Sequence, residues 1–410
     1  MALSNGQSGS DLAEYSRLIM DKVKIKDVCD ILNGFAFKSD NYVDKGIRII
    51  RIANVQKGYI EDSTPAFYPL NSTGLDKYML DKGDLLISLT GNVGRVAILQ
   101  EEMLPAALNQ RVACLRIKSD KISKGYLFHI LNSDFFERKC IQSAKGVAQK
   151  NMSTEWLKNY KIPLYSTEQQ SEIVSVLDTL QSIICNRKYE LQMLDNLIKA
   201  RFVEMFGDPV SNPMGWNKAE LSKCLTSIDN GKSFVCEAYS RVGNEPAILK
   251  LSAATYGCYR PKENKAMLDA DQFNENAEVH SGDLLFTRKN TPELVGMCAY
   301  VYDTPGKLMM PDLIFRLNTS EQCDKIFLWK LINHDLFRPC IENIATGSAK
   351  SMSNISKERL LKLKIILPPI ELQQQFAAFV AAIDKSKATV QKALDETQLL
   401  FDSLMQQYFG

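Results

Sequence analysis

Polar side chains in glycine-flanked loops are the residues of this sequence best suited to bind a ligand, and their types suit duplex DNA. Arg and Lys can donate to guanine edges and phosphates, Asn and Gln can bond adenine edges, and glycines allow close approach to a phosphate. The first half of the chain offers Lys38, Arg48, Arg51, Asn54, Lys57, Tyr59, Thr90, Asn92, Arg95, Asn109, Gln110, Arg111, Lys145, Gln149, Lys150 and Asn151. The second half offers Lys250, Tyr256, Tyr259, Arg260, Lys262, Arg288, Lys289, Asn290, Lys350 and Ser351. For any single residue a solvated loop side chain is the simpler interpretation, but the loops as groups favour contact with DNA.

Residues for catalysis are much harder to find. The three histidines, His129, His280 and His334, stand far apart in the sequence, which disfavours an acid-base or metal centre. Lys232 follows a glycine as in a phosphate-binding loop, but the position that should hold the first glycine is Thr226. We therefore expect no catalytic residue, no metal and no cofactor in this chain, and a stand-alone enzyme is the less favoured alternative.

The elements that must position these loops occur twice. The same landmarks recur in the same order, as expected of a duplication with small loop insertions. They are Gly83-Asp84-Leu85-Leu86 with Gly282-Asp283-Leu284-Leu285, residues 131–136 with 332–337, Gly146 and Met152 with Gly347 and Met352, and Phe206-Gly207 with Phe409-Gly410. Equivalent loops carry different polar residues, so a split, asymmetric target is expected.

Each copy begins with strand-like alternation, as in residues 47–52 and 247–251, and continues with turn-rich loops and a helical stretch. The predicted class is α+β, with two similar mixed α/β domains. We divide the chain into a leader or N-terminal helix, two globular domains and a long helix after each domain. The ranges are 1–22 for the leader, 23–165 and 209–368 for the domains, and 166–208 and 369–410 for the helices.

The two long helical segments have apolar residues in a heptad pattern without an internal Gly or Pro. A 3.5-residue period keeps one stripe facing a partner, which predicts that the two helices form an antiparallel coiled coil. Its predicted seam is Ile173, Leu177, Leu180, Ile184, Leu191, Leu194 and Ile198 with Phe376, Val380, Ile383, Val390, Leu394, Phe401 and Leu404. Arg187, Arg201, Lys387 and Thr397 interrupt the seam, where they either fix its register or face a partner protein. Two ordinary long core helices are the alternative.

Composition and charge are those of an ordinary globular protein of 410 residues, with 45% hydrophobic and 24% charged residues. Lys and Arg outnumber Asp and Glu in residues 23–165 and 209–368, whereas the acids are in excess in the helical segments. A polyanion would therefore be bound by the globular domains. Ten cysteines without a C-x-x-C pair, and no apolar run long enough to span a membrane, favour a cytoplasmic protein.

Several short motifs together resemble the specificity subunit of type I restriction-modification systems, from about residue 23 onward. They are residues 33–39 (NGFAFKS), 83–88 (GDLLIS), 108–111 (LNQR), and the borders Gly146 to Met152, Ile162-Pro163-Leu164 and Glu168-Gln169-Gln170. The borders recur as Gly347 to Met352, Leu367-Pro368-Pro369 and Gln373-Gln374-Gln375. One departure concerns Asn109 to Arg111, because the second copy has Met309-Met310-Pro311-Asp312 nearby.

The resemblance implies two target recognition domains that read a bipartite, asymmetric site in double-stranded DNA and are held apart by a helical ruler. It also implies that two methyltransferase subunits dock on the helices and bring S-adenosylmethionine. Restriction subunits, which use ATP and Mg, would join them, and this chain would be the non-catalytic subunit. A coiled-coil scaffold that binds only proteins is the alternative.

Overall fold

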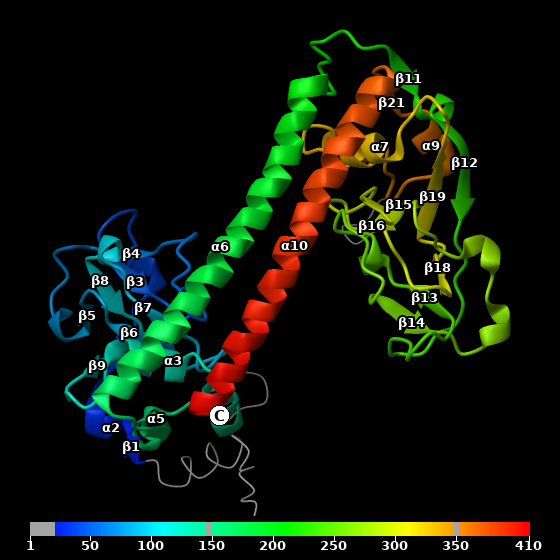
Figure 1. The fold of residues 1–410 in the computed structure, drawn as a ribbon. Coiled ribbons are helices and arrows are strands. Elements are labelled where there is room, and N and C mark those ends of the chain that lie inside the picture. The colour runs from blue at the N-terminus through cyan, green and yellow to red at the C-terminus, as the bar shows by residue number, and fades with distance from the viewer. Residues whose placement is uncertain (1–20, 145–149, 348–351) are drawn as a thin grey trace, which may run out of the picture. The chain divides into compact units, whose positions relative to one another are not determined.

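The computed structural model describes residues 21–144, 150–347 and 352–410. They form two compact units, which are described separately (Figure 1). Unit 1 is the described part of residues 1–188 together with 393–410, and unit 2 is the described part of residues 189–392. Each unit combines one mixed α/β domain with a part of each long helix, so the predicted fold class is confirmed.

The domain of unit 1 is built on two four-stranded sheets. The first has the order β2-β9-β6-β7 with antiparallel neighbours, and the second has the order β4-β3-β8-β5 with β3 parallel to β8. The strands are β1 (Lys22–Lys24), β2 (Cys29–Asn33), β3 (Ile47–Ile50), β4 (Phe67–Tyr68), β5 (Met79–Leu80), β6 (Leu85–Ser88), β7 (Val96–Ile98), β8 (Ala106–Leu108), β9 (Val112–Ile117) and β10 (Lys161–Pro163). The helices are α2 (Ile25–Val28), α3 (Lys124–Leu131), α4 (Asp134–Ser143) and α5 (Thr154–Asn159), with short 3-10 turns at Ser39–Asn41, Asp76–Tyr78 and Glu101–Met103.

Unit 2 repeats this plan with the order β12-β19-β15-β17 in its four-stranded sheet and β14-β13-β18 in its three-stranded sheet. The strands are β11 (Lys218–Glu220), β12 (Leu225–Asn230), β13 (Ala247–Leu249), β14 (Asn264–Ala266), β15 (Leu284–Thr287), β16 (Lys289–Asn290), β17 (Cys298–Tyr300), β18 (Leu308–Met309), β19 (Ile314–Thr319), β20 (Ser353–Asn354) and β21 (Lys364–Ile366). The helices are α7 (Lys325–Ile332), α8 (Arg338–Asn343) and α9 (Lys357–Leu361), with 3-10 turns at Leu221–Lys223, Leu251–Ala253, Ala270–Gln272 and Glu275–Ala277.

The Gly-Asp-Leu-Leu motif leads into a strand that is buried on both faces, which explains its uninterrupted apolar run. In unit 1, Leu85 and Ile87 pack in a core with α3 and α4, whereas Leu86 packs in a second core between the two sheets. Residues 284–286 of β15 alternate in the same way in unit 2. The duplicated motif therefore marks the central strand of each domain.

The acidic residue of the same motif is buried and paired. Asp84 accepts hydrogen bonds from Arg116 Nε at 3.0 Å and from Arg116 Nη2 at 2.7 Å. In unit 2, Asp283 lies 3.5 Å from Nε of Arg316. A buried carboxylate needs such a partner, because an unpaired charge in the core is costly. The ion pair thus accounts for the Asp of both copies.

The two long helices each contribute to both cores. They are α6 (Thr167–Phe206) and α10 (Ile370–Phe409), of 40 residues each. Near its start α6 packs Ile173 and Leu177 into the core of unit 1, and near its end it packs Phe202 and Phe206 into the core of unit 2. Helix α10 packs Phe376 into the core of unit 2, and its last turns pack against the core of unit 1. The terminal parts of both helices are therefore core helices.

The middle parts of the helices pair with each other within each unit. All the seam positions predicted for α6 and α10 are buried or half-buried. In unit 1, Arg187 donates from Nη1 to the carbonyl of Ala393 and to Oγ1 of Thr397. In unit 2, Lys387 pairs across the helices with Asp195. These contacts link opposite helices at defined positions, as expected if the polar seam residues fix the register.

A buried glutamine near the start of each long helix ties the helix to its domain. Gln170 accepts a hydrogen bond from Ser123 N at 2.9 Å and donates to the carbonyl of Lys121 at 2.8 Å. Gln373 accepts from Asp324 N at 2.9 Å and donates to the carbonyls of Gln322 at 3.1 Å and Pro368 at 2.8 Å. Both side chains are fully buried. Each amide therefore connects its long helix to the segment before α3 or α7.

These contacts and the strand pairing correct three details of the predicted repeat. Leu164 corresponds to Leu367, because Leu164 N donates to Asp21 O at 2.9 Å and Leu367 N donates to Asn217 O at 2.8 Å, so the predicted match of Ile162-Pro163-Leu164 to Leu367-Pro368-Pro369 was wrong. Because Gln170 and Gln373 are equivalent, Glu168-Gln169-Gln170 corresponds to residues 371–373, and the predicted match to Gln373-Gln374-Gln375 was wrong. Met152 corresponds to Ile355, since Met152 N donates to Leu89 O and Ile355 N donates to Arg288 O, both at 2.8 Å. The predicted match of Met152 with Met352 was therefore wrong too, and Met352 is 52% exposed. The run of glutamines at residues 373–375 and the changed length of the loop before Met352 explain wrong matches of this kind.

We expect Gln373→Ala to lower the free energy of unfolding of unit 2 by about 1–3 kcal/mol, because it leaves buried backbone groups without partners. Chemical denaturation followed by circular dichroism measures this change. Gln374→Ala is the matched control, since Gln374 is exposed one residue further along the same helix. Equal stability of both variants would show that the amide contacts do not hold the helix to the domain.

Candidate nucleic-acid interface

Several of the predicted DNA-contacting loops of unit 1 meet where β3, β6 and β8 end. Asn109 N donates to the carbonyl of Ile50 at 3.2 Å, and Leu89 N donates to the carbonyl of Arg111 at 2.9 Å. The loop after β6 is also bonded to a distant segment, because Gly91 N donates to the carbonyl of Lys150 at 2.8 Å. We call the resulting cluster the unit 1 edge, and its members are Thr90, Asn92, Asn109, Gln110, Arg111, Lys150 and Asn151.

A glycine sets the spacing of this edge. Gly34 lies against the backbone of the segment after β8, where a Cβ atom on Gly34 would come within 2.2 Å of the carbonyl oxygen of Asn109. The next residue, Phe35, donates from N to the carbonyl of Leu108 at 2.8 Å and accepts from Gln110 N at 2.9 Å. Only a residue without a side chain fits here. The segment that carries Lys38 is thereby held beside the unit 1 edge.

The side chains of the unit 1 edge are available to a ligand. Asn92, Gln110, Arg111, Lys150 and Asn151 are exposed. In the described part of the chain, none of these five side chains has a hydrogen bond or ion pair. A guanidinium, an amine and amides without internal partners can donate to phosphates and base edges. The geometry therefore fits a nucleic-acid contact.

Besides Lys38, six other predicted residues of unit 1 lie outside this cluster, and five of them have internal partners. Arg48 pairs with Asp62 and stacks on Phe67, while Arg51 donates to the carbonyl of Thr64. Asn54 is buried, accepts from Arg51 N at 2.9 Å and donates to the carbonyl of Glu61 at 2.7 Å. Asn54 therefore stabilises a turn, and its buried side chain is not accessible to DNA.

Two of the other three residues have side-chain partners, and the third is exposed; the three are Lys57, Arg95 and Tyr59. Lys57 pairs with Asp134 and with Glu137, at 2.9 Å from the latter, on helix α4. Tyr59 is 57% exposed, and Arg95 donates to the side chain of Gln56. The structure does not bring Lys57 or Tyr59 to the unit 1 edge.

Unit 2 has an equivalent edge with different side chains. Lys232 N donates to the carbonyl of Met310 at 3.0 Å, as Phe35 N does to the carbonyl of Leu108 in unit 1, and Arg288 N donates to the carbonyl of Leu313 at 3.0 Å. Strands β16 and β20 then pair Lys289 with Asn354. We call this cluster the unit 2 edge, and its members are Lys232, Lys250, Arg288, Lys289 and Asn354.

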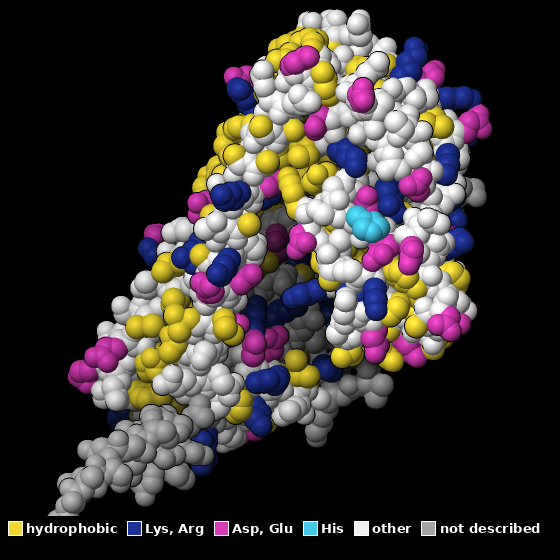
Figure 2. All heavy atoms as spheres, turned by 45° about the vertical axis from the view of Figure 1, so that its right-hand side comes forward, with side chains coloured by type: hydrophobic (Ala, Val, Ile, Leu, Met, Phe, Trp, Pro, Cys, Tyr) yellow, Lys and Arg dark blue, Asp and Glu magenta, His cyan; other side chains and the backbone are white. Residues whose placement is uncertain are grey.

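The side chains of the unit 2 edge are more constrained than those of unit 1. The Arg288 guanidinium stacks over the ring of Phe315 and donates to Asn354 Oδ1 at 3.3 Å. Lys250 lies 3.8 Å from Glu263. Asn290 is buried and donates to Thr255 Oγ1 at 3.1 Å, so this predicted contact residue supports the loop from inside. On the face of unit 2 seen in Figure 2, Lys and Arg side chains are interspersed with Asp and Glu.

Lys232 is a further candidate for DNA contact that the sequence analysis did not name. It is exposed and follows Gly231, whose Cβ would come within 2.0 Å of the carbonyl oxygen of Pro311. This close approach repeats that of Gly34 in unit 1. The shared dipeptide Asn-Gly, at residues 33–34 and 230–231, is the signal that could have found it. Lys145, Gln149, Lys350 and Ser351 lie outside the described residues.

The comparison with known families agrees with this duplicated arrangement. A family model described as the type I restriction modification DNA specificity domain matches residues 20–193 and again residues 213–397. The chain belongs to this family.

Individual relatives share the family. This specificity-domain chain is 32% identical over 184 residues to the type I restriction enzyme MjaVIII specificity subunit of Methanocaldococcus jannaschii, covering 43% of each chain. It is 30% identical over 203 residues to the EcoEI specificity subunit of Escherichia coli and spans 34% of that relative's length. It is 25% identical to the putative MjaX specificity subunit of M. jannaschii, over 90% of this chain and 89% of that one.

A solved structure has the same fold. The S subunit of a type I restriction-modification system from M. genitalium aligns with a TM-score of 0.59 at 13% identity, covering 96% of this chain and 97% of that one. At this identity the likeness concerns the fold alone. Among the described residues of this specificity-domain chain, no group of three or more His, Cys, Asp or Glu side chains could hold a metal ion. No helix among them is long and apolar enough to cross a membrane.

Two of the remaining predicted residues of unit 2 line a cavity whose lining includes no member of the unit 2 edge. Tyr256 and Tyr259 line a cavity of about 660 Å³, together with Tyr302, Trp329 and Lys330. Arg260 stacks on the ring of Tyr256 at 4.9 Å, while Lys262 is exposed. The structure therefore does not place Tyr256 and Tyr259 with the polar groups of the unit 2 edge.

Lys330 is the unusual ionisable group of this cavity. Its Nζ lies 3.4 Å from the centre of the Trp329 ring. Burial lowers the pKa of Lys330 from 10.5 to about 8, although Asp384 and Asp195 oppose this shift. Because the pKa is lower in the folded chain, the charged amine costs stability at neutral pH, and this cost disappears as the pH rises from 8 toward 10.5.

We expect Lys330→Met to raise the free energy of unfolding of unit 2 at pH 7 by about 1–3 kcal/mol, because it removes the cost of a buried charge. The gain should shrink between pH 8 and pH 10. Chemical denaturation at both ends of this range measures it, with Lys385→Met, an exposed lysine of α10, as the control. A gain in stability that does not depend on pH would contradict the lowered pKa of Lys330.

Proposed function

We propose that this chain is the DNA-specificity subunit of a type I restriction-modification complex, in which each unit reads one part of a bipartite, asymmetric site. The main support for this proposal is the difference in side chains between the unit 1 edge and the unit 2 edge. Both occur at the ends of equivalent strands, yet unit 1 presents Asn109-Gln110-Arg111 where unit 2 has Pro311-Asp312-Leu313. Equivalent positions with different hydrogen-bonding groups suit two different half-sites.

The charge distribution supports binding of a polyanion by the domains. Lys and Arg exceed Asp and Glu in both domains and are outnumbered in the long helices. In unit 1 the exposed Arg111 and Lys150 belong to the same edge, and Lys38 lies beside it. Phosphate contacts from such residues would position the duplex, and Asn109 and Gln110 would then contact base edges.

The helix pair supports a fixed spacing between the half-sites. Helix α6 is uninterrupted from Ile173, in the core of unit 1, to Phe206, in the core of unit 2. A helix of 40 residues is about 60 Å long at about 1.5 Å per residue, and two modules on one face of DNA must be about one helical turn, roughly 34 Å, apart. The pair would then act as a ruler that sets the unread spacer.

Docking of two methyltransferase subunits fits exposed apolar residues on the helices. Leu197 of α6 is 45% exposed and Leu400 of α10 is 50% exposed, and both occupy the same position counted from the start of their helix. Two equivalent apolar positions suit two copies of one partner. The methyltransferase subunits would bring S-adenosylmethionine, restriction subunits would bring ATP and Mg, and this chain would supply recognition without catalysis in the cytoplasm.

We expect Arg111→Ala to weaken binding of the assembled complex to its target duplex by about 1–3 kcal/mol, the value of one good side-chain contact to a base. Fluorescence anisotropy at two salt concentrations measures the loss. Lys45→Ala is the control, because Lys45 is exposed in the same unit but lies outside the unit 1 edge. Unchanged affinity, together with binding that does not depend on salt, would favour the protein-only scaffold instead.

We expect Leu197→Asp and Leu400→Asp each to remove one methyltransferase subunit from the complex, and the double variant to remove both, because a buried unpaired carboxylate opposes association. Light scattering of the purified complex measures the number of subunits. The control is Leu70→Asp, which charges a leucine that is 71% exposed and lies outside the helices. A full complex in the double variant would place the docking surface elsewhere.

A further inference from the structure

The cavity of unit 2 that Lys330 lines presents an amine to molecules from solution. It has a volume of about 660 Å³, and two of the rings that line it, Tyr256 and Tyr302, are exposed. Lys330 is half-buried, with its Nζ 3.4 Å from the centre of the Trp329 ring. In the described part of the chain, this amine has no hydrogen bond or ion pair. Lys330 therefore contributes an unpaired amine to the wall of an open cavity.

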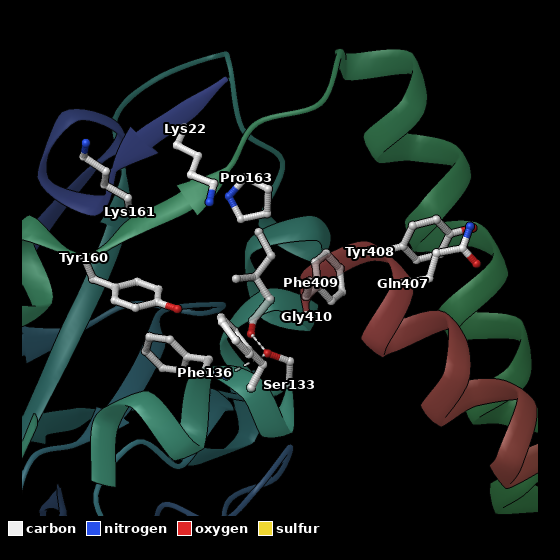
Figure 3. A pocket seen from close by; sticks show the side chains of 12 residues that line it. Lys22, Ser133, Phe136, Tyr160, Lys161, Pro163, Gln407, Tyr408, Phe409 and Gly410 are labelled. Carbon is white, nitrogen blue, oxygen red and sulfur yellow. Dashed lines mark hydrogen bonds between the residues drawn. The ribbon is translucent and has the colours of Figure 1, made fainter. Parts of the chain in front are cut away.

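The residue of unit 1 that corresponds to Lys330 follows from the way α3 and α7 end. In unit 1, Ser133 N donates to the carbonyl of Ile130 at 3.1 Å, and Ser133 Oγ donates to the same carbonyl at 2.7 Å (Figure 3). In unit 2, His334 N donates to the carbonyl of Leu331 at 3.1 Å. Because these bonds close equivalent helices, the residues one position before Ile130 and Leu331 also correspond. They are His129 and Lys330.

The long helices offer different partners to these two residues. His129 Nε2 lies 2.8 Å from Oδ1 of Asp178 on α6, so the imidazole has a carboxylate partner. Asp178 stands eight residues after the buried glutamine of α6, and Ala381 stands eight residues after the equivalent glutamine of α10. Alanine has no carboxylate to pair with Lys330. Unit 2 thus lacks the ion-pair partner that unit 1 has at the equivalent position.

The surroundings of Lys330 favour the neutral amine. Burial lowers the pKa of Lys330 to about 8, Lys387 acts in the same direction, and Asp384 and Asp195 act against it. At pH 7.5 such an amine is about one-quarter neutral, whereas an ordinary lysine is neutral in about one molecule per thousand. The titratable groups around the amine are Asp195 of α6, Asp384 and Lys387 of α10, Tyr300 of β17, and Cys258, Tyr302 and Asp303 of neighbouring loops.

We infer that Lys330 is a modification site, acylated by a small acyl thioester that enters this cavity. The amine nitrogen would attack the thioester carbonyl carbon and form an amide. The bond between that carbon and sulfur would break, and the sulfur would leave with the electron pair. The proton lost by the nitrogen would go to the thiolate, so that a thiol is released.

The charges of the cavity suit both the reagent and the product. A thioester group is uncharged, and the carboxylates of Asp195, Asp303 and Asp384 among the described lining residues would repel an anionic acyl donor. The amide product is also uncharged, so acylation removes the cost of a buried charge. Because His129 stands at the equivalent position of unit 1, the modification would distinguish unit 2 from unit 1.

The rate of acylation tests the site. The probe is S-acetyl-N-acetylcysteamine, a small neutral thioester, used with the full chain at pH 7.5. Peptide mass spectrometry should show acetylation of Lys330 at least about tenfold faster than that of Lys385, an exposed lysine of α10. The rate at Lys330 should rise with pH up to about 8 and then level off, because the amine is then largely neutral. Equal rates at the two lysines would overturn the proposal.

A change of charge in the cavity tests the surroundings. Asp384→Asn should lower the pKa of Lys330 further and raise its acetylation rate at pH 7 at least about twofold, because Asp384 favours the charged amine. The asparagine oxygen can still accept the hydrogen bond that Tyr302 donates to Asp384 at 2.7 Å. Glu371→Gln makes the same change of charge at an exposed position of α10 and should leave the rate unchanged. Equal rates in these two variants would contradict the assigned surroundings.

The stability of the product is a second readout. The acetylated chain should unfold at a higher denaturant concentration at pH 7 than the unmodified chain, because the buried charge is gone. The same treatment of Lys330→Met should not raise the midpoint, which separates Lys330 from the other lysines. A midpoint that does not rise, or that rises equally in Lys330→Met, would show that the cavity does not accommodate the amide and would refute the site.

Discussion

Each long helix must bury apolar residues in two different cores at once, and the rest of the structure depends on this constraint. Helix α6 packs Ile173 and Leu177 into the core of unit 1 and Phe202 and Phe206 into that of unit 2. Helix propensity alone would not hold a helix in place over 40 residues, because most helical stability in proteins comes from tertiary packing. Burial at both ends provides that packing, and the polar seam contacts of Arg187 and Lys387 then fix how the helices pair.

The same packing determines where the loops of the unit 1 edge and the unit 2 edge lie. The buried glutamines Gln170 and Gln373 tie each helix to its domain, and the Gly-Asp turns start the central strands β6 and β15. Because the strand ends of each domain meet at one edge, the loops that follow them form one surface. The scaffold can therefore stay the same in both units while the loop side chains differ, which is what a protein that reads two unlike sequences requires.

The heptad seam and the duplicated Gly-Asp-Leu-Leu motif could be predicted because periodicity and repetition reflect burial directly. Contact residues could not be predicted one by one. Asn54 and Asn290 have suitable side chains for base contacts, but both are buried and hold turns. Residue type does not tell whether a polar group faces solvent or a backbone amide. Lys232 was overlooked for the opposite reason, since its position depends on the close approach of Gly231 to Pro311.

The central claim is that this chain selects the DNA sequence at which a partner acts. The most direct measurement is sequencing of adenine methylation in cells that contain the cognate methyltransferase subunit, with and without this chain. The account predicts a two-part, asymmetric methylated motif that appears only when this chain is present. Purification of an intact complex without any new methylation would contradict it.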